Sequence, residues 1–199
     1  MKLTKTALMF LSRGFEDLEA AAIIDVLGWT RVRDHLAPIG VRTCAFHDEV
    51  AGKFGMRIPV DHNLRRETPD PLEFAAFVLP GGFHDAGFDE AYAADLHSLA
   101  CRIHANGGAI ATMCVGVLPI ADAGLLRGRR ATTYSLSRFH DNVGRLERAG
   151  AIYTGRRTET DSRIISCAGP ASSVEVALEL VRLLTGDENA SEVRRLMMF

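Results

Sequence analysis

Short apolar segments alternate with amphipathic ones along most of this 199-residue chain, and no other feature restricts its fold as strongly. Short apolar runs bounded by turn residues are typical of buried strands, and they lie at residues 6–12, 74–82 and 109–114. Longer segments with apolar residues at helical spacing lie at residues 18–36, 89–107 and 172–186. Apolar strands that alternate with helices predict an α/β fold, in which helices cover both faces of a mostly parallel sheet.

Weaker segments complete the expected order of elements. A strand is expected at residues 40–47, and Pro59 places the segment 56–64 at a sheet edge or in a hairpin. A helix is expected at residues 137–150, and a last amphipathic helix at about 190–199, which we expect to dock on the domain or to contact a second copy. Because no repeat or long linker interrupts the chain, residues 1–199 are predicted to form a single domain.

Charge and hydropathy exclude several classes of partner. The net charge is −2 with both signs interspersed, so we expect no nucleic-acid and no membrane partner. The first apolar run meets Arg13 too early to span a bilayer and lacks a cleavage-site pattern. We therefore expect a cytoplasmic location.

Four cysteines, Cys44, Cys101, Cys114 and Cys167, stand far apart with no CxxC pair. This spacing indicates neither a zinc site nor a redox dithiol, and we expect no metal and no other cofactor. Cys44, Cys101 and Cys167 are interpreted as packing residues in or near the core.

Three strand ends carry unusual residues, at positions 13–19, 80–84 and 114–116. The carboxyl ends of parallel strands open on one edge of the sheet, so we expect these segments to converge there. Cys114 is either a packing thiol or a nucleophile on a tight strand-to-helix turn, where the helix N-terminus would lower its pKa.

The other two segments also have two interpretations each. Gly81 and Gly82 form a simple turn, or they let a backbone N–H of this segment join that of Val115 in an oxyanion hole. The acidic residues after the first strand serve the electrostatics of a helix N-terminus, or one of them lies beside Cys114. A carboxyl group buried beside a reactive thiol should be neutral, with a raised pKa.

Four motifs follow one another along the chain: RGFEDLEAAAIIDVL, FVLPGGF, GGAIATMCVGVLPIADAGLLRGRRATTY and IISCAGPASSVEVALELVRLLTG. In this order they resemble the DJ-1/PfpI (ThiJ/PfpI) superfamily, a branch of the class I glutamine amidotransferase-like fold. The resemblance implies a flavodoxin-like three-layer sandwich and a homodimer. It also implies that Cys114 is the nucleophile-elbow cysteine and that Glu19 hydrogen-bonds to it. Gly82 and Val115 match the positions whose N–H groups line an anion pocket, and Glu16 matches a second acidic position.

Two departures from the family pattern affect the predicted chemistry. Branches that resemble hydrolases have a histidine directly after the cysteine, where this chain has Val115, which argues against a peptidase. Another branch has a histidine where this chain has Tyr134, a poor base near neutral pH. His84 is the nearest remaining candidate for acid–base work, or it is a surface histidine of a loop. His104 and His140 are expected on helices.

Besides a binding or interface role with a catalytically idle pocket, three functions remain open from the sequence. The first is glyoxalase- or deglycase-like chemistry on small reactive carbonyls. The second is an isonitrile hydratase- or amidase-like reaction. The third is a non-enzymatic redox-sensing or chaperone-like role, in which an oxidant converts Cys114 to a sulfinate. The expected partner is accordingly a small-molecule substrate or an oxidant.

Overall fold

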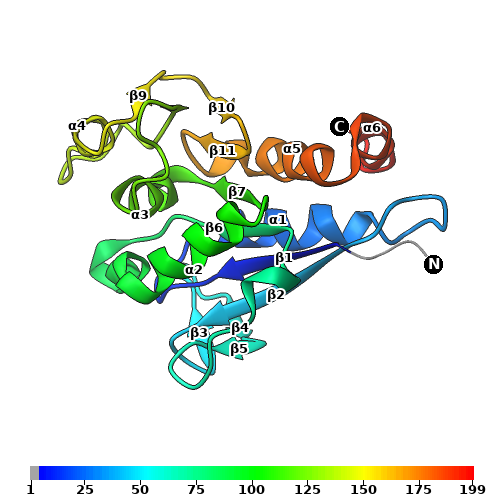
Figure 1. Ribbon diagram of the computed structural model, residues 1–199, viewed down its shortest axis with the longest axis horizontal. Coiled ribbons are helices and arrows are strands. Elements are labelled where there is room, and N and C mark those ends of the chain that lie inside the picture. Colours follow the sequence, from blue (N-terminus) through cyan, green and yellow to red (C-terminus); the bar gives the residue numbers. More distant parts are fainter. Residues whose placement is uncertain (1–4) are drawn as a thin grey trace.

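A mostly parallel seven-stranded sheet forms the centre of the computed structural model, which describes residues 5–199 (Figure 1). Its strands are β1 (Lys5–Phe10), β2 (Ile39–Ala45), β5 (His62–Asn63), β6 (Ala76–Leu79), β7 (Ala109–Thr112), β10 (Thr158–Asp161) and β11 (Ile164–Cys167). They lie in the order β10-β11-β7-β6-β1-β2-β5, and only β10 and β11 pair in antiparallel fashion. The parallel sheet predicted from the apolar runs is therefore confirmed.

Helices cover both faces of this sheet. They are α1 (Asp17–Trp29), α2 (Ala94–Ala105), α3 (Val117–Asp122), α4 (Asn142–Arg148), α5 (Ser173–Thr185) and α6 (Asp187–Leu196). Ile23 of α1 and Val181 of α5 share one buried cluster with Met9, while Leu99 of α2 shares the other with Phe77. These layers make the flavodoxin-like three-layer sandwich that the family resemblance implied. Within residues 5–199, every helix is too short or too polar to span a bilayer.

The last helix docks on its own chain. Val193 of α6 is fully buried in the cluster beneath α5. The Asn189 side chain accepts a hydrogen bond from the Ala37 N–H (2.9 Å) and donates one to the Ala37 carbonyl (3.2 Å). These contacts hold α6 against its own chain, and a contact with a second copy stays a prediction.

Two small sheets flank the central one. Antiparallel β3 (Glu49–Ala51) and β4 (Arg57–Pro59) form the hairpin that Pro59 indicated, and β8 (Arg130–Ala131) pairs with β9 (Ile152–Tyr153).

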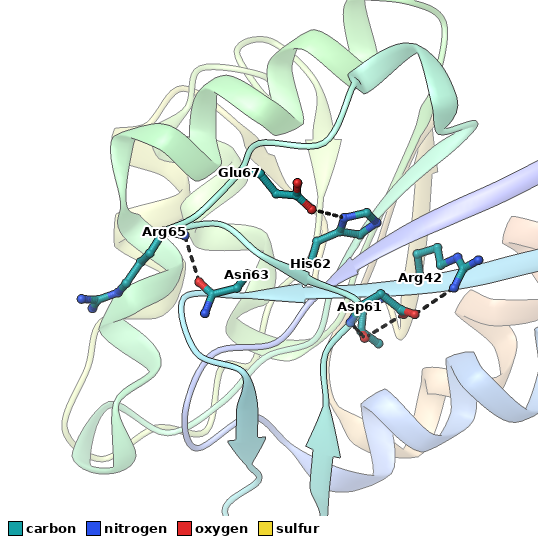
Figure 2. A network of polar contacts seen from close by, with 7 residues as sticks. Arg42, Asp61, His62, Asn63, Arg65 and Glu67 are labelled. Atoms are coloured by element: carbon teal, nitrogen blue, oxygen red, sulfur yellow. Dashed lines mark hydrogen bonds and ion pairs between the residues drawn. The ribbon is translucent and has the colours of Figure 1, made fainter.

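A network of polar contacts surrounds β5, the strand at one edge of the central sheet (Figure 2). The Asp61 carboxylate accepts hydrogen bonds from the Thr43 N–H (2.8 Å) and from the Arg42 guanidinium (2.9 Å). Beside it, His62 lies 3.6 Å from a Glu67 carboxylate oxygen. A short edge strand flanked by charged side chains is a poor template for pairing with a further strand.

Two predicted helices are shorter than expected. The helix expected at 18–36 ends at Trp29, where the Thr30 hydroxyl donates to the Leu27 carbonyl (2.6 Å) and accepts from the Ile39 N–H (2.9 Å). The helix expected at 137–150 begins at Asn142, because the Asp141 carboxylate accepts from the Gly144 N–H and caps it there. The prediction that His140 lies on a helix is therefore wrong.

Candidate active site

The three unusual strand ends meet where β1 and β6 are neighbours. The chain leaves β1 toward β2 on one side of the sheet and adds β6 and β7 on the other, so this is a topological switch point. The Glu16 N–H donates to the Gly81 carbonyl (2.9 Å), and the Phe83 N–H donates to the Gly14 carbonyl (2.9 Å). These bonds tie the segment after β1 to the segment after β6. The predicted convergence is confirmed.

Cys114 occupies a strained elbow between β7 and α3. Its φ of 52° lies in the left-handed region that side chains other than glycine rarely adopt. The Gly116 N–H donates to the Met113 carbonyl (2.7 Å), and the Thr133 hydroxyl donates to the Cys114 carbonyl (3.1 Å). A Cβ at Gly116 would clash with the Leu79 carbonyl oxygen. Several contacts thus hold the cysteine in a conformation that it would not adopt alone.

Glu19 lies fully buried beside this elbow. Its Oε2 accepts a hydrogen bond from the Gly81 N–H (2.6 Å), whereas its Oε1 is buried with no hydrogen-bond partner. Cβ of Cys114 and Oε2 of Glu19 lie 2.9 Å and 3.1 Å from the point where a Gly81 side chain would begin. Gly81 therefore packs between the thiol and the acid and leaves no room for a larger residue.

Burial raises the pKa of Glu19 to about 8, so this carboxyl group is protonated at neutral pH. The direction of this pKa shift is the one expected for a carboxyl group buried beside a reactive thiol. Within residues 5–199, Oε2 of Glu19 bonds to the Gly81 N–H and Oε1 has no hydrogen-bond partner, so the bond to Cys114 that the resemblance implied is not formed.

Burial also raises the pKa of the Cys114 thiol, and negative charge on Glu19 would raise it further. The Val115 N–H acts in the opposite direction, but its effect is smaller. The expectation that the helix N-terminus would lower this pKa is therefore wrong, because burial outweighs it. A thiol of this kind must transfer its proton as it reacts.

A cavity of about 850 Å³ opens above the elbow. The predicted site residues in its wall are Glu16, Gly82, His84, Cys114, Val115 and Tyr134. Glu16 also caps α1, because its Oε2 accepts from the Glu19 N–H (2.8 Å), and burial raises its pKa.

The cavity wall contains residues that the sequence did not single out. His140 lies on the loop before α4, with its ring centroid 4.6 Å from that of His84. Phe54 reaches the cavity from the β3–β4 loop, whose N–H groups at Phe54 and Met56 donate to the Asp17 carboxylate. Leu136 and Phe139 lie on the same wall as His140. Loop residues without periodicity carry no signal for such a placement.

The other cysteines match their interpretation as packing residues. Cys44 and Cys167 are fully buried, and Cys101 is partly buried with its thiol facing the Ala123 carbonyl. Burial raises the pKa of Cys167 to about 12, although the Cys114 N–H faces its sulfur. His104 lies on α2 as expected and faces the Gly108 carbonyl.

The model of the DJ-1/PfpI family matches residues 5–183. The chain belongs to this family. Protein DJ-1 homolog A of Arabidopsis thaliana is 29% identical over 98% of the chain, and a deglycase of Thermococcus kodakarensis is 28% identical over 89% of it. The chain spans 47% of the Arabidopsis protein and 98% of the archaeal one, so it is about half as long as the former.

The crystal structure of Drosophila melanogaster DJ-1beta superposes with a TM-score of 0.82, at 24% identity and 98% coverage of both chains. At this identity the likeness establishes the fold, and the family's flavodoxin-like architecture agrees with the layers described above.

Proposed function

We propose that this DJ-1/PfpI family member is a cysteine-dependent enzyme that acts on small reactive carbonyls, in the manner of a glyoxalase or deglycase. The observation that carries the proposal is a strained cysteine in a cavity wall with a protonated, buried carboxyl group packed beside it. The name of the Thermococcus relative, a deglycase, supports the same class of substrate.

The first step forms a bond between the Cys114 sulfur and the aldehyde carbon of the substrate. The S–H bond breaks as this bond forms, the carbonyl electron pair moves to oxygen, and the thiol proton passes to that oxygen. The same oxygen accepts hydrogen bonds from the N–H groups of Gly82 and Val115 at the same wall. Protonated Glu19 has a free Oε1, which donates to the sulfur while it carries negative charge.

With an α-oxoaldehyde, the adduct is a hemithioacetal. Its carbon-bound proton moves to the neighbouring carbonyl carbon and its hydroxyl proton to the oxygen of that carbon, which yields a thioester. Water then releases a 2-hydroxy acid and the free thiol. The aldehyde carbon is oxidised and the ketone carbon is reduced within one molecule, so no external redox partner takes part.

Lactate formation from methylglyoxal tests this proposal. We expect Cys114→Ala to lose activity by at least about 100-fold, because it removes the nucleophile. Cys101→Ala is the matched control, since that thiol lies outside the cavity wall, and it should retain wild-type activity. No lactate from the wild-type protein, or equal rates in wild type and Cys114→Ala, would refute the proposal.

A further inference from the structure

The proposed reaction needs a base that its nucleophile and its buried acid do not provide. Burial keeps both Cys114 and Glu19 protonated at neutral pH. Glu19 is also fully buried behind Gly81, so it cannot reach a proton on a bound substrate. The position after the cysteine is Val115, which has no ionisable group.

His84 lies in the wall of the same cavity as Cys114. It begins a 3-10 turn, His84–Ala86, two residues after Gly82. Its Nδ1 lies 2.6 Å from an Asp89 carboxylate oxygen. Because a carboxylate only accepts hydrogen bonds, Asp89 selects the tautomer that carries its proton on Nδ1. Nε2 is then left as a proton acceptor.

Neighbouring rings hold the His84 imidazole in one orientation. Phe88 meets it edge-on with centroids 5.5 Å apart, and Tyr92 lies nearly parallel to it at 6.1 Å. His140 contacts it from the loop before α4, at 4.6 Å. The His84 side chain is only 21% exposed. A surface histidine of a loop would have none of these constraints on its orientation.

Other ionisable groups line the same cavity. His140 is one of them, but within the described residues it lacks the carboxylate partner that orients the His84 ring. Glu16 also lies in the cavity wall, but its Oε2 accepts the Glu19 N–H at the start of α1. That bond commits Oε2 to the start of the helix, but burial raises the pKa of Glu16 overall, so the Glu16→Gln variant is needed to separate the two candidates. Tyr134 lies in the wall too, and a phenol is a poor base near neutral pH.

We propose that His84 is the general base of the carbon-to-carbon proton transfer, and that Asp89 is the positioning residue that orients it. This inference rests on the proposed function. Nε2 takes the proton from the hemithioacetal carbon, and the electron pair of that C–H bond forms a carbon–carbon double bond as the ketone oxygen becomes an enolate. The imidazolium then returns the proton to the neighbouring carbon as the carbon–carbon double bond reverts to a single bond. The hydroxyl proton of the former aldehyde passes to the former ketone oxygen, which leaves a thioester carbonyl on one carbon and a hydroxyl on the other.

Four variants test the assignment with methylglyoxal: His84→Gln, Asp89→Asn, Glu16→Gln and the control His104→Gln, whose histidine lies on α2. We expect His84→Gln to lower kcat by at least about 100-fold and to change KM by less than about threefold, because the sulfur–carbon bond still forms. Iodoacetamide should alkylate Cys114 at nearly the wild-type rate in this variant. Added imidazole should restore part of the lost kcat.

A kinetic isotope effect and a conservative variant distinguish a role of His84 and Asp89 in the chemical step from a purely structural role. With aldehyde-deuterated methylglyoxal, His84→Gln should show a larger isotope effect on kcat than wild type, because proton abstraction becomes fully rate-limiting. Asp89→Asn should lower kcat by about tenfold, and Asp89→Glu should recover part of it. His84→Asn serves as a second variant if His84→Gln melts at a lower temperature than wild type.

Two results would contradict the assignment of His84 as the general base while leaving the proposed function in place. One is a His84→Gln kcat within about threefold of wild type while Cys114→Ala is inactive. The other is a large loss in Glu16→Gln with little change in His84→Gln, which would make Glu16 the base. Absence of lactate from the wild-type protein would instead remove the proposed function and this inference together.

Discussion

Cys114 carries backbone strain that its side chain makes worse. A residue at φ 52° costs about 1 kcal/mol less as glycine than as alanine, because glycine has no Cβ to clash with the neighbouring carbonyl. We therefore expect Cys114→Gly to be more stable than Cys114→Ala, although glycine removes one more carbon atom. Urea unfolding midpoints of the two variants measure the difference.

Cys101 provides the control for this comparison. It lies inside α2, where glycine is less stable than alanine by about 1 kcal/mol. The order of the two variants should therefore reverse at position 101. If alanine were the more stable of the two residues at both positions, the elbow would be unstrained in solution.

At the scale of elements, the approach of the elbow to the end of β6 depends on Gly116. A Cβ there would overlap the Leu79 carbonyl oxygen, so β6 and η4 (Cys114–Gly116) would have to separate. We expect Gly116→Ala to cost about 2 kcal/mol of unfolding free energy and to lower turnover.

Gly28 is the matched control, because it lies exposed in α1 with nothing within 4 Å of a built Cβ. Gly28→Ala should stabilise the protein by up to about 1 kcal/mol. Chemical denaturation measures both changes. Equal effects of the two alanines would show that the elbow tolerates the added atom.

Two loops also set the width of the cavity mouth. Phe54, Leu136 and Phe139 all line the cavity, and they are 70%, 76% and 90% exposed. We predict that a Leu136→Ala and Phe139→Ala double variant lowers kcat/KM for phenylglyoxal at least about fivefold more than for methylglyoxal, because only the aromatic ring reaches these side chains. Leu72→Ala, at an equally exposed leucine outside the cavity wall, should leave the ratio unchanged. An unchanged ratio in the double variant would place the aromatic substrate elsewhere.

At the scale of the whole molecule, Glu19 links stability to pH. Burial raises its pKa from 4.5 to about 8, so between these pH values the folded protein holds a proton that the unfolded chain has released. Wild-type stability should therefore fall as pH rises from 4.5 to 8, by up to about 4 kcal/mol.

Glu19→Gln removes this titration while it keeps the side-chain shape. Its urea midpoint should change much less between pH 5 and 8 than that of wild type. The reason is that glutamine does not titrate, whereas the pKa of Glu19 is about 8 in the folded protein and 4.5 in the unfolded chain. Glu147→Gln on the surface of α4 should keep the wild-type slope. Parallel profiles for Glu19→Gln and wild type would contradict a protonated Glu19.

The homodimer and the cytoplasmic location expected from the sequence stay predictions.

The sequence by itself determined the parallel sheet, most of its helices, and the convergence of three strand ends near Cys114 and Gly82. These features follow from periodicity and from the geometry of parallel strands, which act over short segments. The four family motifs, too, are local patterns.

Only the tertiary structure decided the environments of the site residues. It showed that Glu19 bonds to Gly81, that burial raises the pKa of Cys114 despite the helix N-terminus, and that His84 Nδ1 lies 2.6 Å from an Asp89 carboxylate oxygen. It also moved His140 from an expected helix to the cavity wall. Burial and hydrogen bonding at these positions depend on how distant segments pack, and a local pattern of residues contains no measure of that packing.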